Sequence, residues 1–564
     1  MTYSSNKSTR AEAASAAPIT ATLPGPRALD HARHKTIAAT TERMMIITMN
    51  GVTEAHTSPQ PPSPPDPHRI TVTASTDDEQ DLERDEDEGR DRPSGFTGRA
   101  PGSVLRRSHL AVLRLRDGLM MEQPVPAGQR PVQAESRLAC ADPGSDAGTL
   151  PRVVFVAFGK VYPRRSSVSV PTAFFPRQEA LNSKMAWGEW SGWFSVPVYA
   201  DFHDIEYSAI REAAAVIDVS PLYKYEVSGP DAQRLLDRVM TRDMTKLRVD
   251  RVFYSPWCDE EGKVLDDGTI ARLDDTTYRV TAAGASYRWF TMNATGLEVE
   301  IVDVSDGTAA LALQGRLSRE VLQDATRQDW SDLKYFGRRR TEIGGVAVDI
   351  TRTGYTGDRG YELWMAADEA LQVWDELFEV GERYGIYPVG INAMDVARVE
   401  AGLILIEAEY TSARHAVAPE QQYSPYELGF QALVDLGKST DFTGRRALRA
   451  EHAAGGPARR LVGLELDWTG IEGMFAKHGQ APAISPFVHR APVPVYRDAR
   501  QIGRATSITW GTTIKKMVGF GSVDRGHAAT GTRLSVEWSV EGERGTVGAT
   551  VVPLPFLDLE RKRT

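Results

Sequence analysis

The chain has 564 residues, a formal net charge of −10, and 41% hydrophobic and 25% charged residues. This composition is typical of a globular protein, and the length predicts several domains. Part of the negative charge comes from one acidic run at 77–91, so the charge argues against a nucleic-acid partner. No apolar stretch approaches the ~18 residues of a membrane span. Cys140 and Cys258 provide neither a disulfide framework nor a metal set, which favours a cytoplasmic protein without a metal.

The first 168 residues differ in composition from the rest of the chain. They are rich in Ser, Thr, Ala, Pro, Arg and Asp, with a cluster of prolines at 61–67. Such a composition cannot bury enough apolar surface to offset the conformational entropy lost on folding. We therefore expect residues 1–168 to be a disordered extension, or the product of an upstream start site. An organellar transit peptide is the alternative, and the length fits it poorly.

Two later segments have the periodicity of amphipathic helices. Residues 231–240 form the first, with Ser228 as a candidate N-cap and Pro230 close behind it. Residues 369–384 form the second, with Trp374 on its buried stripe. Both helices are expected to contribute to a core rather than to a site.

A strand, a turn and a second strand are predicted over residues 254–267. The turn separates an aromatic-rich strand that begins near Tyr254 from a strand that carries Asp266 and Asp267. Since neighbouring residues of a strand point to opposite faces, only one of these carboxylates can face a given pocket. Beside a bound amine, that carboxylate could orient or exchange a proton. The alternative is a solvated turn with acidic flanks.

A second motif follows alternating apolar residues at 346–350. It predicts a strand, a glycine-rich turn at 351–360 and another short strand, and it would bring Tyr355 and Glu362 close together. A carboxylate beside aromatic rings suits a flat heterocycle with an amidine-like N–H edge, because it accepts two parallel hydrogen bonds. The alternative is a plain hairpin.

Short strands alternate with glycine-rich turns toward the end of the chain. The predicted strands are residues 461–466, 503–508, 517–523 and 534–538. This pattern predicts a small β-barrel whose boundary falls at 450–460.

Several motifs occur in the order found in the aminomethyltransferase family, which includes the tetrahydrofolate-dependent T-protein of glycine cleavage and its demethylase relatives. Besides the motifs around Asp267 and Glu362, they are residues 172–193, 217–220, 395–403, 424–429 and 441–448. From about residue 170 onward the chain resembles this family. The resemblance implies an α+β fold with three lobes. A folate-binding portion of two α/β subdomains would span residues 169–450, and a C-terminal β-barrel would span residues 458–558.

The resemblance also implies roles for individual residues. Glu362 matches the family's folate-binding glutamate, and Tyr254 and Tyr355 match tyrosines of the cofactor site. Asp267 matches the aspartate beside the reactive folate nitrogens and is the expected catalytic residue. Tetrahydrofolate is the implied cofactor.

Departures from the family pattern concern the donor of the one-carbon group. Met394 replaces an arginine, Pro221 replaces a histidine, Lys263 replaces a glycine, and the stretch at 405–425 is longer than in a T-protein. Substrate choice diverges in loops on a rigid scaffold. We therefore expect a small methylated substrate to donate a methyl group, in place of the lipoyl arm of a carrier protein.

Arg414 and His415 lie in the longer stretch and are candidates for gripping a substrate carboxylate or phenolate. The alternative for the histidine is solvated surface. Two other functions remain open: a true glycine-cleavage T-protein that works with a lipoyl carrier protein, and a non-catalytic folate-binding protein. The sequence leaves open whether the methyl group leaves oxygen, nitrogen or sulfur.

Overall fold

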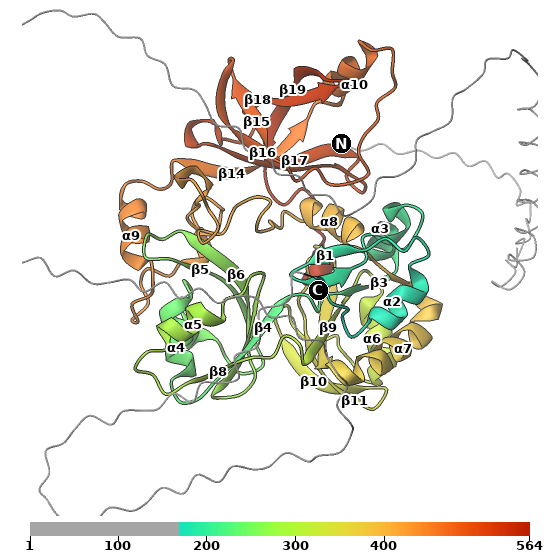
Figure 1. Cartoon of the computed structure of the whole chain (residues 1–564), viewed down its shortest axis with the longest axis vertical. Helices are drawn as coiled ribbons and strands as arrows, with labels where there is room; N and C mark the ends of the chain where they lie inside the picture. Colours follow the sequence, from blue (N-terminus) through green and yellow to red (C-terminus); the bar gives the residue numbers. More distant parts are fainter. Residues whose placement is uncertain (1–167) are drawn as a thin grey trace, which may run out of the picture. The chain divides into compact units, whose positions relative to one another are not determined.

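A computed structural model describes residues 168–564 (Figure 1). These residues contain a six-stranded sheet, a five-stranded sheet, a closed barrel, and a two-stranded sheet of β1 (Gly188–Trp190) and β2 (Trp193–Ser195). Mixed helices and sheets followed by a barrel confirm the predicted α+β class. The prediction of a disordered extension at 1–168 lies outside the described residues, apart from Val168.

The six-stranded sheet has the strand order β10-β11-β12-β9-β3-β13. Its strands are β3 (Ala214–Asp218), β9 (Thr308–Gln314), β10 (Arg338–Ile343), β11 (Val346–Thr351), β12 (Gly360–Ala366) and β13 (Ile386–Pro388). The helices of this part of the chain are α2 (Phe175–Leu181), α3 (His203–Glu212), α6 (Ser318–Thr326) and α7 (Ala370–Gly381). Alternate residues of β9 join different apolar clusters, Leu311 with Trp374 and Ala312 with Trp364. Both faces of the sheet are therefore buried.

The helix predicted at 369–384 is α7, which is flanked by the short 3-10 helices η3 (Ala367–Glu369) and η4 (Glu382–Tyr384). Trp374 is buried in it, as expected from the periodicity.

The five-stranded sheet has the order β5-β6-β7-β4-β8. Its strands are β4 (Tyr223–Ser228), β5 (Val252–Cys258), β6 (Val264–Arg272), β7 (Thr277–Ala282) and β8 (Glu300–Asp303). Two helices, α4 (Ala232–Val239) and α5 (Tyr287–Asn293), belong to this part of the chain, as does η2 (Met244–Lys246). The predicted strand, turn and strand around Asp267 are β5 and β6.

The predicted N-cap of α4 is wrong. The N-cap residue is Asp231, whereas Ser228 is the last residue of β4. Ser228 pairs with Thr277 on one side and with Glu300 on the other. Because both neighbouring strands hold it in the sheet, the chain turns into the helix three residues later.

The barrel closes in the order β14-β17-β16-β15-β18-β19. Its strands are β14 (Arg459–Leu466), β15 (Val493–Arg497), β16 (Arg500–Gly511), β17 (Lys516–Asp524), β18 (Arg533–Val540) and β19 (Glu543–Val552), and α10 (Trp468–Ala476) follows β14. The four predicted strands are part of β14, β16, β17 and β18. The remaining two strands, β15 and β19, were not predicted from the sequence.

A long connection joins the two sheets to the barrel. It begins after α8 (Ile391–Glu400) and contains η5 (Pro419–Gln421), η6 (Gln431–Leu433) and α9 (Arg445–Ala453); η7 (Arg525–His527) and η8 (Glu560–Lys562) lie further on. The fully buried guanidinium of Arg398 contacts Asp395 at 2.7 Å, Glu409 at 2.8 Å and Ser507 of β16 at 2.6 Å. The planar Arg398 guanidinium therefore links α8, the long connection and β16 of the barrel.

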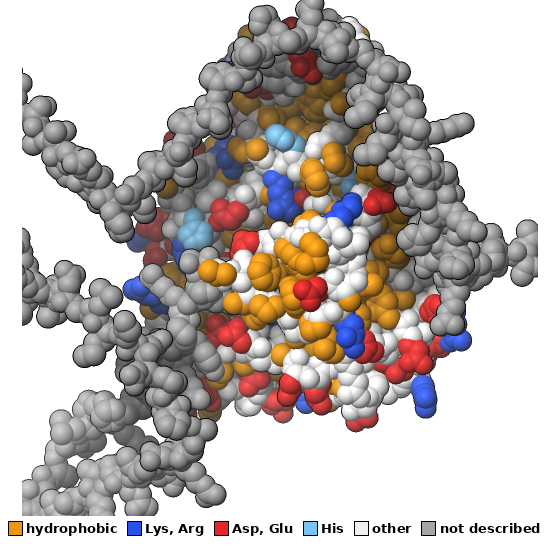
Figure 2. Space-filling view, turned by 45° about the vertical axis from the view of Figure 1, so that its right-hand side comes forward, with side chains coloured by type: hydrophobic (Ala, Val, Ile, Leu, Met, Phe, Trp, Pro, Cys, Tyr) orange, Lys and Arg blue, Asp and Glu red, His pale blue; other side chains and the backbone are white. Residues whose placement is uncertain are grey.

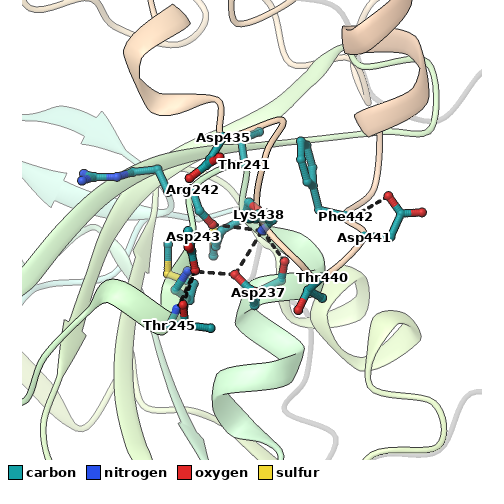
Figure 3. Close-up of polar contacts among 12 residues, drawn as sticks. Asp237, Thr241, Arg242, Asp243, Thr245, Asp435, Lys438, Thr440, Asp441 and Phe442 are labelled. Carbon is teal, nitrogen blue, oxygen red and sulfur yellow. Dashed lines mark hydrogen bonds and ion pairs between the residues drawn. The ribbon is translucent and has the colours of Figure 1, made fainter.

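Lys438 fastens the same connection to the five-stranded sheet (Figure 3). Its buried ammonium donates to the backbone carbonyls of Asp237, Met240 and Arg242, and to the Asp237 carboxylate at 3.2 Å. Carbonyls at the end of a helix lack intrahelical partners, so the lysine satisfies the C-terminus of α4. Nearby, Thr241 donates to the carbonyl of Leu433 at 2.8 Å.

The surface visible in Figure 2 mixes acidic and basic side chains around clusters of hydrophobic ones. Within residues 168–564, no helix combines the length and apolarity that crossing a membrane requires. The cytoplasmic location and the absence of a nucleic-acid partner stay predictions.

Candidate active site

Asp267 of β6 lies between the phenols of two tyrosines. Tyr254 of β5 donates to its Oδ2 at 2.5 Å, and Tyr410 of the long connection donates to its Oδ1. Burial raises the pKa of Asp267, and the two phenol hydrogen bonds lower it in part. Both carboxylate oxygens are therefore held in one orientation by two segments that are distant in sequence.

Asp266 is engaged elsewhere, as the strand alternation requires. Its carboxylate accepts from the backbone N–H groups of Gly284 at 2.9 Å and Asp267 at 2.8 Å. Its exposed fraction is 1%. Burial and the adjacent Asp267 carboxylate raise the pKa of Asp266 to about 7. The two neighbouring carboxylates thus differ in partners, and Asp267 is the one held by phenols.

The side chains of Tyr355 and Glu362 have different hydrogen-bond partners. The phenol of Tyr355 donates to the carbonyl of Ile404, and burial raises its pKa. Glu362 accepts from the Thr353 hydroxyl at 2.7 Å; burial raises the pKa of Glu362, and Arg279 lowers it in part. No hydrogen bond among the described residues joins Tyr355 to Glu362. Of these two residues, Tyr355 is the one near Asp267. The negative charge of Asp267 adds to the effect of burial in raising the pKa of the Tyr355 phenol.

The glycines of this turn are explained by close packing. A Cβ at Gly354 would lie 2.1 Å from the side chain of Gln314, and one at Gly357 would lie 2.4 Å from the Cβ of Ala401. Gly357 also has a φ of +71°, in the left-handed region that favours glycine. The turn can therefore approach β9 and the end of α8 only because these side chains are absent.

Among the described residues, neither Arg414 nor His415 has a hydrogen bond or ion pair with Asp267. Arg414 donates to the carbonyl of Ala285 at 3.0 Å, and burial lowers its pKa. The His415 side chain is 66% exposed, and its Nδ1 lies 3.1 Å from a Glu407 carboxylate oxygen. Their role in binding a substrate stays a prediction.

Two residues of the site carried no role in the sequence-based prediction. Tyr410 lies in the longer stretch, but it is 143 positions from Asp267, and no motif links them. Arg490 contacts Asp395 with its Nε at 2.8 Å. Met394, next to that aspartate, is buried in an apolar cluster. Asp395, next to Met394, therefore meets two guanidinium groups, those of Arg398 and Arg490.

The half-buried carboxylates of Asp267 and Glu362 suit a ligand with N–H groups. Within the described chain, neither Glu362 nor Asp267 has an ion-pair partner within 4.0 Å. A buried carboxylate is costly unless a donor or a cation satisfies it, and the N–H edge of a pterin is such a donor. Among residues 168–564, no group of three or more His, Cys, Asp or Glu side chains could hold a metal ion.

Two family models match the described chain. The GCVT N-terminal domain matches residues 175–438, and the glycine cleavage T-protein C-terminal barrel domain matches residues 459–558. With the two sheets, the barrel and the carboxylates of Asp267 and Glu362, these matches define the class: a transferase with the fold of the glycine-cleavage T-protein.

Individual relatives identify the family. The aminomethyltransferase of Anoxybacillus flavithermus is 33% identical over 390 residues, 68% of this chain and 98% of that protein. The aminomethyltransferase of Bacillus cytotoxicus is 31% identical over 373 residues, 65% of this chain and 93% of that protein. The crystal structure of the glycine cleavage system aminomethyltransferase T from Bartonella henselae has a TM-score of 0.58 and 24% identity, covering 69% of this chain and 98% of that one, and supports the fold. The chain belongs to the aminomethyltransferase family, which is folate-dependent in general.

Proposed function

We propose that this chain transfers a one-carbon group to tetrahydrofolate, and that the group arrives as an aminomethyl group. The observation that carries the proposal is the Asp267 carboxylate, which is half-buried, lacks a paired cation among the described residues and is fixed by two phenols. The relatives named aminomethyltransferase support this donor better than the methyl donor expected from the sequence departures. A lipoyl carrier protein is the partner that such a donor requires.

The described residues divide the work between binding and proton handling. Glu362 would accept from the N–H edge of the pterin, and Tyr355 would line the site near Asp267. Tetrahydrofolate supplies the amine that accepts the carbon. Asp267 would hold the proton of that amine and stabilise positive charge developing beside it, with Tyr254 and Tyr410 fixing its orientation. Correct placement of donor and acceptor would supply much of the rate.

A second candidate is methyl transfer from a small methylated substrate. The observation that favours it is Tyr410, because it reaches Asp267 from the stretch at 405–425, which is expected from the sequence motifs to be longer than in a T-protein. A changed segment at the reacting centre is a place where donor choice can change. Arg414 and His415, from the same stretch, would then contact the anionic part of the donor.

One incubation separates these candidates. The full chain is mixed with tetrahydrofolate and, separately, with aminomethyl-loaded lipoyl carrier protein, dimethylglycine, a methoxybenzoate or a methylated sulfur compound. Mass spectrometry of the folates is the measurement, with Asp267→Asn as the control protein. 5,10-Methylenetetrahydrofolate and ammonia from the carrier alone would support the first proposal. 5-Methyltetrahydrofolate from a small substrate would support the second, and no conversion with any donor would contradict both.

A further inference from the structure

A cavity of about 660 Å³ lies outside the Asp267 site. Its walls come from residues 426–436, from the end of α9 with the glycine turn that follows, and from the start of β14. Neither Asp267 nor Glu362 lines it. Its volume is within the ~300–1,000 Å³ range of small-molecule sites.

The two arginines that begin β14 have different roles at this cavity. Arg459 is engaged by the protein: its Nε lies 2.9 Å from Glu427, and its guanidinium lies over the Tyr423 ring at 4.2 Å. Arg460, the next residue, points to the other side of the strand and lines the cavity. In the described part of the chain, no hydrogen bond or ion pair engages the Arg460 side chain, which is exposed.

The acidic group in the wall is already neutralised. Glu427 is 5% exposed; besides Arg459, its carboxylate accepts from the backbone N–H of Ser424 at 2.8 Å and lies 3.8 Å from Lys263 Nζ. The imidazole of His452 also lines the cavity and has no hydrogen-bond partner within residues 168–564. The free charge presented to a ligand is therefore positive.

The remaining wall favours a flat apolar body. The ring of Tyr426 lies 6.1 Å from that of His452, and Val434, Leu436 and Leu461 add aliphatic surface. We propose that this cavity is a second ligand site, which binds a small aromatic carboxylate with its charge on Arg460 and its ring beside Tyr426. Arginine is suited to this task because its planar fork matches a carboxylate.

The site shares a segment of chain with the active site. Gly429 and Gln431 line the cavity, and Phe430 between them packs its ring edge-on against Tyr254 at 5.8 Å between centroids. Tyr254 in turn donates to Asp267. A ligand in the cavity would therefore contact the same segment of chain that carries Phe430, and its binding would not depend on the identity of the one-carbon donor.

Calorimetric titration of the full chain with 2-naphthoate tests the proposal. We expect saturable one-to-one binding that is unaffected by saturating tetrahydrofolate. The neutral analogue 2-naphthamide should bind roughly tenfold more weakly, because a charge-assisted hydrogen bond is lost. Arg460→Gln should weaken 2-naphthoate by a similar factor, whereas Arg446→Gln, an exposed arginine of α9 outside the cavity, should not.

Three results would overturn the proposal: no binding at millimolar 2-naphthoate, equal affinity for acid and amide, or loss of binding when tetrahydrofolate is present. The amide comparison uses the unaltered protein, so it decides the role of charge even if a variant is unstable. Diffraction from a crystal soaked in 2-naphthoate places the ligand, and density at the Asp267 site alone would also contradict the assignment.

Discussion

The phenol of Tyr410 donates a hydrogen bond to Oδ1 of Asp267, across 143 positions of the chain. Tyr254 holds the other oxygen of the same carboxylate. A hydrogen bond to the ionised form of an acid lowers its pKa, and burial works in the opposite direction. The acidity of Asp267 therefore depends on a tyrosine from the stretch at 405–425 of the long connection.

Replacement of Tyr410 by phenylalanine tests this dependence. Losing the donor should raise the pKa of Asp267 further, so the acidic limb of the kcat/KM profile should move to higher pH. Near neutral pH, activity should fall roughly tenfold, since a hydrogen bond to a charged group is worth about 1.5–3 kcal/mol. Activity should recover as the pH is raised, which a purely structural defect would not produce.

Tyr423→Phe is the matched control for that experiment. Tyr423 is a buried tyrosine of the same connection, and its phenol donates to Ser522 at 3.2 Å rather than to Asp267. Its pH profile should keep the position of the unaltered enzyme. An identical profile for Tyr410→Phe would contradict the proposed coupling.

The raised pKa of Asp266 predicts that the stability of the folded protein depends on pH. Its pKa is about 7 in the folded protein, above the 3.8 of an unperturbed aspartate, so the folded state binds more protons between these values. The free energy of unfolding should therefore fall as pH rises from about 4 to about 7, by up to about 4 kcal/mol from this group. Denaturant unfolding at several pH values measures it.

Asp266→Asn should flatten that dependence, because the group can no longer titrate. Asp275→Asn, in an exposed turn, should leave the slope as it is. Equal slopes for Asp266→Asn and the unaltered protein would mean that Asp266 does not retain its proton in the folded state.

Glu362→Ala should weaken tetrahydrofolate binding about tenfold or more, because one or two charge-assisted hydrogen bonds to the pterin are lost. Turnover at saturating folate should change much less. Anaerobic calorimetry and initial rates measure the two effects. Glu342→Ala, an exposed glutamate of β10, is the control. A large loss of turnover with unchanged affinity would reverse the assigned role.

Lys438→Met should lower the free energy of unfolding by about 2–4 kcal/mol, since the buried carbonyls lose this donor and the Asp237 carboxylate loses its cation. Lys516→Met removes a half-exposed surface pair with Glu465 and should change it by less than about 1 kcal/mol. Urea unfolding measures both. Equal effects would show that the buried ammonium is not needed for stability.

The sequence predicted what local motifs encode and missed what distant contacts create. Alternation located most strands of the barrel, and the turn motifs located Asp267 and Glu362. Ser228 was misplaced as a cap because pairing on both sides of β4 overrides a local preference. The partners Tyr410 and Arg490 come from 143 and 95 positions away, with no periodicity or motif to mark them.

The most direct test of the account compares Asp267→Asn with the unaltered enzyme in the folate reaction, once the donor is known. Because proton transfer by a placed side chain contributes about 10²–10⁴-fold, kcat should fall at least about a hundredfold. The Kd for tetrahydrofolate should change little, because the proposed contact between Glu362 and the pterin is not altered. Unchanged kcat, or loss of folate binding with normal turnover at saturation, would contradict the central claim that Asp267 handles the proton.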